Sequence, residues 1–126
     1  MRVTHSDQGF LHLIGAQAPT AEDGEARLAV DVDERHLNPS GSVHGGMLAT
    51  LVDTTMGAAV RSTVDDEVPA TSQLSMTYLR PGKVGRLLVT ANVRKRGDNI
   101  TVCEADVEQD GRSLVHAVAT FALIDR

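Results

Sequence analysis

The sequence is poor in aromatic side chains: 126 residues include no tryptophan, one tyrosine and two phenylalanines. Aromatic stacking on an aryl group is therefore scarcely available to this protein. Its single cysteine, Cys103, excludes an internal disulfide and is typical of a protein from the reducing cytoplasm. Because Cys103 lies in an expected strand, we interpret it as a packing residue rather than a nucleophile.

Long hydrophobic runs are also missing. Residues 1–8 contain no apolar segment of the kind found in a signal peptide. The apolar stretch 47–60 is too short, and too interrupted by Gly, Thr and Asp, to span a bilayer. The length and an apolar fraction of 41% are typical of one globular domain over residues 1–126. We therefore expect a cytoplasmic protein with no membrane partner.

Acidic residues are absent between Val68 and Gly97, although the whole chain carries a net charge of −5. The bases in this window are Arg80, Lys83, Arg86, Arg94, Lys95 and Arg96. A local basic field on an acidic protein suits a small polyanion better than a nucleic acid, so we expect no nucleic-acid partner. The alternative is a solvated sheet edge, where lysine and arginine discourage aggregation.

Hydrophobic periodicity predicts two strands, one long helix and then further strands. The first strand is expected over residues 10–17, and the second over residues 25–33, where apolar and polar residues alternate. A loop over residues 36–43 leads into a helix that starts with Gly45 and Gly46 and ends near Arg61. The later strands are expected at residues 70–79, 85–95, 100–109 and 112–124, joined by tight turns such as Asp110-Gly111.

The helix is apolar nearly all round, so it is expected to be buried on every side. Strands joined by tight turns form an antiparallel sheet. A helix buried on every side requires a curved sheet, because a flat one covers only one face. The predicted fold class is α+β, with a curved antiparallel sheet wrapped around one long central helix.

Two features of this helix oppose its stability. Glycine in a helix costs about 1 kcal/mol relative to alanine, and Gly45 and Gly46 stand at its start. Asp53 is the ionisable group within its apolar stretch, and a buried carboxylate is costly unless it is paired. Two such violations in one element suggest a functional site.

The helix start belongs to a longer motif. The spacing N-x-x-G-x-x-H-G-G, followed on the helix by an acidic residue, occurs as Asn38, Gly41, His44, Gly45, Gly46 and Asp53. With this motif, and in segments 77–81 and 93–97, the sequence resembles hotdog-fold acyl-CoA thioesterases of the phenylacetate-pathway and thioesterase-superfamily-member type. The resemblance extends from about residue 25 to the end. It implies hydrolysis of an acyl- or aryl-acyl-CoA to free acid and CoA, with no cofactor apart from the substrate's own CoA.

The resemblance assigns the central chemistry to two residues. Gly45 is expected to donate its N–H to the oxyanion, supported by Gly46, since N–H groups at a helix start are unpaired and lie at the positive end of the dipole. The alternative for both glycines is a plain helix entry. Asp53 is expected to act as general base or nucleophile, and the resemblance leaves both roles open. Its alternative is a structural carboxylate bonded to Thr50, Thr54 or the backbone.

Four further residues are candidates for a catalytic role. Asn38 holds the thioester or the attacking water, or is simply a turn residue before Pro39. His44 donates toward the thioester, or only caps the loop. One hydroxyl, from Thr71 or Ser72, matches the position at which the family keeps a group that orients water.

The resemblance also gives the basic window a ligand. The residues expected to bind the CoA phosphates by charge-assisted hydrogen bonds are Arg94, Arg96, Lys83 and Arg80. The residues expected to line the acyl pocket are Met47, Leu51 and Met56. No Cys/His spacing suggests a metal site.

The spacing within the helix bears on assembly. Gly45 and Asp53 are eight residues apart, which is about 12 Å along the axis and about 80° around it. Both therefore cannot touch one carbonyl carbon: either Asp53 acts elsewhere, or the site combines Gly45 of one subunit with Asp53 of another. In the resembling family the site is shared across a dimer and tetramers are common. We expect an obligate homodimer, and a homotetramer built from such dimers.

Two alternative functions remain at this point. A hotdog hydratase or dehydratase acting on an acyl thioester pairs a catalytic histidine with an acid in different motifs, to which His44 followed by two glycines is a poor match. A non-catalytic acyl-CoA binding module usually carries a DNA-binding extension, for which 126 residues leave no room.

Overall fold

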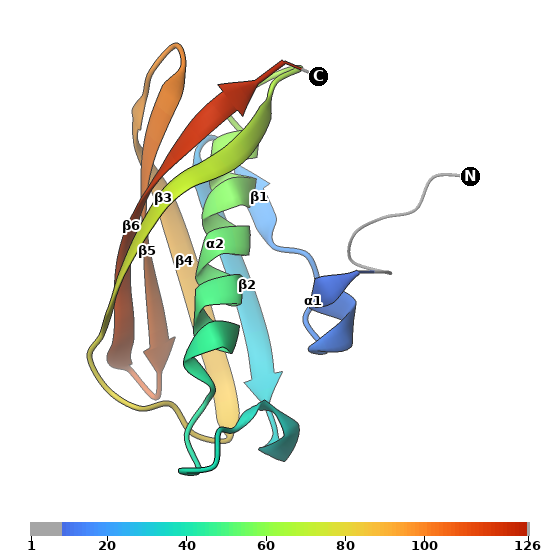
Figure 1. Ribbon diagram of the computed structural model, residues 1–126, viewed down its shortest axis with the longest axis vertical. Coiled ribbons are helices and arrows are strands. Elements are labelled where there is room, and N and C mark those ends of the chain that lie inside the picture. Colours follow the sequence, from blue (N-terminus) through green and yellow to red (C-terminus); the bar gives the residue numbers. More distant parts are fainter. Residues whose placement is uncertain (1–8, 126) are drawn as a thin grey trace.

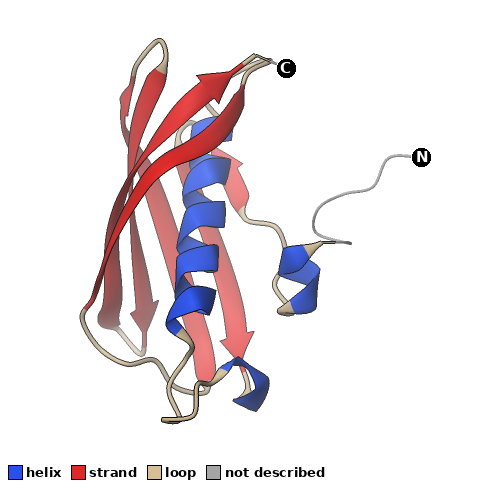
Figure 2. Ribbon diagram, viewed as in Figure 1, coloured by secondary structure: helices blue, strands red, loops and turns tan. Residues whose placement is uncertain are grey.

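The structure is a computed structural model that describes residues 9–125. Residues 1–8, where no signal peptide is expected, lie outside the described part. The helices are α1 (Phe10–Leu13), the 3-10 helix η1 (Glu34–His36) and α2 (Gly45–Arg61). The strands are β1 (Thr20–Glu22), β2 (Glu25–Val32), β3 (Val68–Tyr78), β4 (Gly85–Arg96), β5 (Ile100–Gln109) and β6 (Arg112–Ile124) (Figure 2).

One antiparallel sheet contains all six strands, in the order β1-β2-β4-β5-β6-β3. Positive φ angles at Asp110 (52°) and Gly111 (77°) close the β5–β6 hairpin, as this dipeptide predicts. Figure 1 shows the sheet bending around α2, with β2 and β4 behind the helix and β6 and β3 beside it. The predicted α+β fold, a curved antiparallel sheet around one central helix, is confirmed.

The core lies between α2 and the inner face of the sheet. In β2, the buried residues alternate with exposed ones, as predicted; they are Ala26, Leu28, Val30 and Val32. The stripe of α2 that packs on the sheet consists of Met47, Leu48, Leu51, Val52, Thr55, Met56, Ala59 and Val60. Removal of these side chains from water is the main force that holds the helix on the sheet.

The opposite face of α2 is only partly covered by the sheet. The half-buried residues of the helix are Ala49, Thr50, Asp53, Thr54, Gly57 and Ala58, of which Ala58 packs against the core. The prediction that the helix is buried on every side is therefore wrong for a single chain, and Asp53 is half-exposed rather than buried. This face carries mainly small side chains, and such residues are also common on buried faces. The sequence pattern therefore does not show that this face is only partly covered.

The strand predicted over residues 10–17 is also wrong. This segment contains the short helix α1, and the first strand, β1, follows it between the two strands that were predicted. Leu11 and Ile14 are three residues apart, which places both on one helical face against the core. The backbone oxygen of Ile14 accepts a hydrogen bond from Nε2 of buried His36 (2.7 Å), which fixes the segment to η1.

The remaining predicted elements are confirmed to within two residues at each end. No helix within residues 9–125 combines the length and the apolarity needed to cross a membrane.

Candidate active site

The first turn of α2 leaves one backbone donor unused. His44 is the N-cap residue: its Nδ1 accepts the Gly46 N–H (3.0 Å), and its backbone oxygen accepts the N–H groups of Met47 (3.0 Å) and Leu48 (3.2 Å). Within the described residues, the Gly45 N–H has no acceptor. Gly45 is thus the free donor at the positive end of the helix dipole, whereas the Gly46 N–H is already engaged.

The cap also defines the role of His44. Because Nδ1 accepts a hydrogen bond, the neutral ring carries its proton on Nε2. Of the two alternatives raised by the sequence, the structure shows the capping role, and the exposed ring keeps an Nε2–H donor for a ligand.

Tyr78, at the end of β3, is a site residue that sequence reasoning missed. Its O–H donates to the Gly45 backbone oxygen (3.0 Å), and its ring lies 3.5 Å from the position that a Cβ on Gly45 would occupy. Tyr78 is the sole tyrosine of the chain and belongs to segment 77–81, one of the segments that resemble hotdog-fold thioesterases. Its contact with Gly45 at the start of α2 marks it as a residue of the site.

A cleft of about 510 Å³ opens at this helix tip. Its floor includes His44, Gly45 and Gly46, and the polar residues Asn38 and Arg80 lie on its walls. The apolar side chains on the cleft are those of Val43, Leu48, Tyr78, Leu79 and Pro81. A small ligand with an apolar part can therefore bring a carbonyl oxygen to the free N–H.

The acyl-pocket prediction needs correction. Met47, Leu51 and Met56 point into the core against the sheet and none of them lines the cleft. They occupy the sheet-facing stripe of α2, which explains their burial.

Asn38 shapes the loop before α2. Its Oδ1 accepts the backbone N–H groups of Ser40 (2.9 Å) and Ser42 (3.2 Å), and its Nδ2 donates to Ser42 Oγ (3.1 Å). The side chain is thus bonded within the loop, in line with the turn role, while it also lies on the wall of the cleft.

Asp53 is paired with one of the two candidate hydroxyls. Thr71 Oγ1 donates to Asp53 Oδ1 at 2.6 Å. Ser72 instead contacts Thr120, with its Oγ 3.1 Å from the backbone oxygen and 2.8 Å from Oγ1. The two residues are neighbours on β3, next to a register shift between Thr71 and Gln73, and their hydrogen bonds show that Thr71, not Ser72, meets α2.

Within one chain, Asp53 and the cleft remain apart. Asp53 lies two turns along α2 from Gly45 and does not line the cleft. The Asp53–Thr71 pair instead opens on the partly covered face of the helix.

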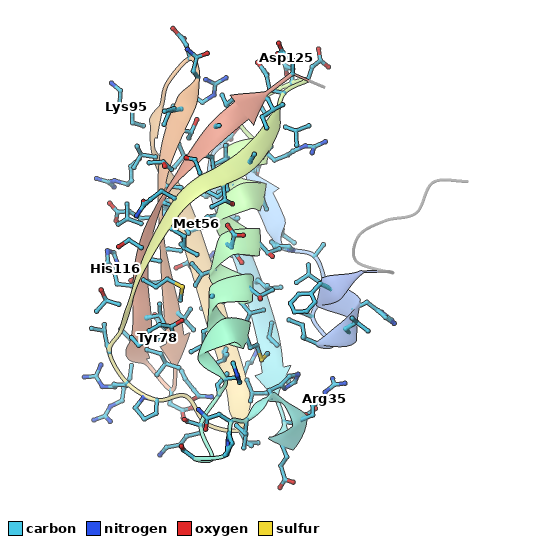
Figure 3. The ribbon with its side chains drawn as sticks, in the orientation of Figure 1. Arg35, Met56, Tyr78, Lys95, His116 and Asp125 are labelled. Carbon is cyan, nitrogen blue, oxygen red and sulfur yellow. The ribbon has the colours of Figure 1, made fainter. Side chains whose placement is uncertain are left out.

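The predicted phosphate ligands fall into two groups. Arg80 and Lys83 lie in the loop after β3, close to the cleft. Arg94 and Arg96 lie at the end of β4; Arg94 pairs with Glu104 (3.2 Å), and Arg96 donates to the Gly97 backbone oxygen. Figure 3 shows Tyr78 at the end of the molecule where α2 begins and Lys95 at the other end.

Cys103 is a core residue, as predicted. It is fully buried on β5, and this burial raises the pKa of its thiol from 9.0 to about 11. A thiol in this state is a poor nucleophile at neutral pH.

Sequence comparison points to one protein family. The profile described as the thioesterase superfamily matches residues 40–125. A candidate esterase from Halobacterium salinarum is 40% identical over 107 residues, which cover 80% of this chain and 70% of that protein. Acyl-coenzyme A thioesterase 13 from Homo sapiens is 32% identical over 89 residues, or 70% of this chain and 64% of that protein. This chain therefore spans less than two thirds of the human relative.

Solved structures share the fold. A candidate thioesterase from Ralstonia eutropha JMP134, described as a phenylacetic acid degradation-related protein, has a TM-score of 0.81 at 28% identity, covering 89% of this chain and 87% of that chain. The smu.793 protein of Streptococcus mutans UA159, solved bound to acetyl CoA, has a TM-score of 0.79 at 28% identity, covering 85% of this chain and 86% of that chain.

Proposed function

Since this chain belongs to the thioesterase superfamily and is thereby a thioester hydrolase, we propose that it hydrolyses an acyl-CoA to the free acid and CoA. The family membership confirms the resemblance seen in the sequence. The names of the human relative and of the acetyl-CoA-bound neighbour support CoA thioesters as the substrate class. The observation that carries the proposal is the free Gly45 N–H at the tip of α2, which opens on a cleft.

In the proposed reaction, the thioester carbonyl oxygen accepts a hydrogen bond from the Gly45 N–H. Water adds to the carbonyl carbon and gives a proton to the Asp53 carboxylate while the Gly45 donor stabilises the oxyanion. The C–S bond then breaks, and the thiolate of CoA takes up the proton. In the other open route, the carboxylate itself attacks the carbonyl carbon, the C–S bond breaks and CoA leaves as thiolate. Water then hydrolyses the resulting anhydride to the free acid and the Asp53 carboxylate, and the thiolate takes up the proton released.

The Asp53 that serves each cleft is proposed to come from the adjacent subunit. β3 is an edge strand of eleven residues, long enough to pair with a second copy. Antiparallel pairing about its middle sets the Tyr78 end of one β3 beside the Val68–Thr71 end of the other. Because Tyr78 contacts Gly45 and Thr71 contacts Asp53, this pairing brings the free donor of one copy toward the carboxylate of the other.

The remaining roles complete the proposal. His44 Nε2–H and the Asn38 side chain face the bound thioester, and Gly46 contributes by letting the ligand approach the helix start closely. We propose a homodimer that assembles further into a tetramer, acts in the cytoplasm and needs no cofactor. The candidates for phosphate ligands are Arg80 and Lys83 near the cleft, and Arg94 and Arg96 at the other end of β4.

The oxyanion donor can be removed with little disturbance of the helix. Gly45 is the first residue of α2, where proline is tolerated because the helix does not use this N–H. His44 has φ −57° and ψ 129°, the extended conformation required before proline. We expect Gly45→Pro to lower kcat about 10²- to 10³-fold. Gly45→Ala keeps the N–H and meets only ordinary contacts with Tyr78, so it should lose much less.

The base is tested by Asp53→Asn, with release of free thiol measured over a panel of acyl-CoAs. We expect a loss of about 10²- to 10⁴-fold in a folded protein. A variant that unfolds, or hydrolyses as fast as the wild type, makes Asp53 a structural carboxylate. Hydration of an enoyl-CoA without thiol release would indicate the hydratase, and acyl-CoA binding without turnover would indicate a binding module.

A further inference from the structure

A second hollow, of about 570 Å³, lies where the loop after β3 meets the β5–β6 hairpin. Three cationic side chains line it, those of Arg80, Lys83 and Arg112, against one carboxylate, that of Asp110. We call this hollow the cationic pocket. It concentrates positive charge on a protein whose net charge is −5, so it favours an anionic ligand.

A buried glutamine fixes the shape of the cationic pocket. The Gln109 side chain is 7% exposed and uses both ends of its amide on one backbone residue: Oε1 accepts the Lys83 N–H (2.9 Å), and Nε2 donates to the Lys83 backbone oxygen (2.8 Å). The loop that carries Lys83 is therefore held to the end of β5. Gly82 packs tightly against Val43 and Leu114, which fixes the same loop from its other side.

The cationic pocket is continuous with the cleft. Arg80 and Pro81 line both hollows. Nη1 of Arg80 donates to the Ser113 backbone oxygen (2.9 Å), so its guanidinium is held against β6 at their border. A ligand with phosphates in the cationic pocket can thus extend an arm across Pro81 toward the Gly45 N–H.

We propose that the cationic pocket binds phosphate groups of the substrate's CoA, with Lys83 and Arg112 as the principal ligands. The inference rests on the proposed thioesterase function and extends it to a residue, Arg112, that lies outside the basic window of the sequence. A concave pocket matches a compact phosphorylated nucleotide better than the flat contact made by a carrier protein. In contrast, Arg94 and Arg96 are partnered by Glu104 and Gly97 at the far end of β4.

The test compares acyl-CoA with the same acyl group on pantetheine, which lacks the phosphates. Wild type should prefer acyl-CoA through a lower KM. Lys83→Gln and Arg112→Gln should each shrink this preference about tenfold, the effect of one charge-assisted hydrogen bond at a partly exposed site. The difference between wild type and each variant should become smaller as the salt concentration is raised. Salt screens the phosphate contact that the wild type makes and the variant has already lost.

Two matched variants control for the loss of charge alone. Lys95→Gln, at the far end of β4, and Arg86→Gln, on an arginine paired with Asp31 (3.4 Å), should keep the wild-type preference. The assignment is overturned if the Lys83 and Arg112 variants keep it too, or if only Arg94→Gln and Arg96→Gln reduce it. A defect seen with an acyl-carrier protein but not with acyl-CoA also overturns it. If the wild type cleaves both substrates without preference, phosphate binding in the cationic pocket is refuted but thioester hydrolysis is not. If it cleaves neither substrate, the proposed thioesterase function itself is refuted.

Discussion

Thr71 supplies the hydroxyl that hydrogen-bonds Asp53. Substitutions can distinguish its role from that of its sequence neighbour, Ser72. Replacing Thr71 by valine removes the 2.6 Å hydrogen bond while keeping the side-chain shape. We expect kcat to fall about tenfold or more with little change in KM, because a bond to a charged group is lost. Ser72→Ala is the matched control, since Ser72 Oγ bonds Thr120 instead. Equal losses from both variants would contradict a specific role for Thr71.

Cys103 makes the protein sensitive to alkaline pH. The thiol has a pKa of about 11 in the fold and 9.0 ordinarily, so between these values the unfolded chain loses its proton first. Stability should therefore be unaffected below pH 9 and should fall as pH rises toward 11, by about 2 kcal/mol near pH 10.5.

Urea unfolding of wild type and Cys103→Ala at pH 8 and at about pH 10.5 isolates this effect. The variant should lose less stability over this interval, although its starting stability is lower because a small cavity is left. All other side chains are the same in both proteins, so their contributions cancel in the comparison. Identical losses would show that the buried thiol does not control this pH range.

Much of the candidate site could be predicted from the spacing of the residues in the motif. The positions of His44, Gly45 and Asp53 on one helix follow directly from the motif. The contact of Tyr78 with Gly45 could not be predicted, because it joins residues 33 apart in sequence. The choice between Thr71 and Ser72 could not be predicted either, because it depends on which face of β3 packs toward Asp53 on α2.

Among the elements, β3 carries the proposed contact between subunits. Within residues 9–125 its outer edge has no partner strand, and it is eleven residues long. We expect Ser75→Lys, an exposed position near the middle of β3, to raise the dimer dissociation constant about tenfold or more, because each copy then places a lysine, a residue that disfavours edge-to-edge pairing, on the shared strand edge. Thiol-release activity should fall in parallel.

Sedimentation at several concentrations, with activity measured on the same samples, tests this expectation. Ala21→Lys is the matched control, since Ala21 is exposed on β1, the short strand at the opposite edge of the sheet. A Ser75→Lys protein that stays dimeric and active would move the interface away from β3.

Periodicity predicted the elements that bury a face against the chain's own sheet, such as β2 and the inner stripe of α2. It failed at α1, where a strand was expected over residues 10–17, although the three-residue spacing of Leu11 and Ile14 suits a helical turn. It also failed for the outer face of α2. The pattern of Ala49, Asp53 and Gly57 does not show which surface covers a face, the chain's own or that of another copy.

At the scale of the whole molecule, the shared site predicts that two inactive proteins restore activity when mixed. Gly45→Pro lacks the donor and Asp53→Asn lacks the base. In a hybrid dimer, the cleft that combines Gly45 of one chain with Asp53 of the other has both groups, while the second cleft has neither. Random exchange makes half of the dimers hybrid, each with one intact cleft, so activity should reach roughly one quarter of the wild-type rate.

Subunit exchange must be confirmed separately, for example by mass spectrometry of differently labelled chains. The double variant Gly45→Pro/Asp53→Asn mixed with wild type is the matched control, because its hybrids have one defect in each cleft and should be inactive. Exchange without recovery would contradict the shared site. Because Gly45 and Asp53 of one chain are about 12 Å apart along α2, that outcome would mean that Asp53 does not act on the carbonyl carbon held at the Gly45 N–H.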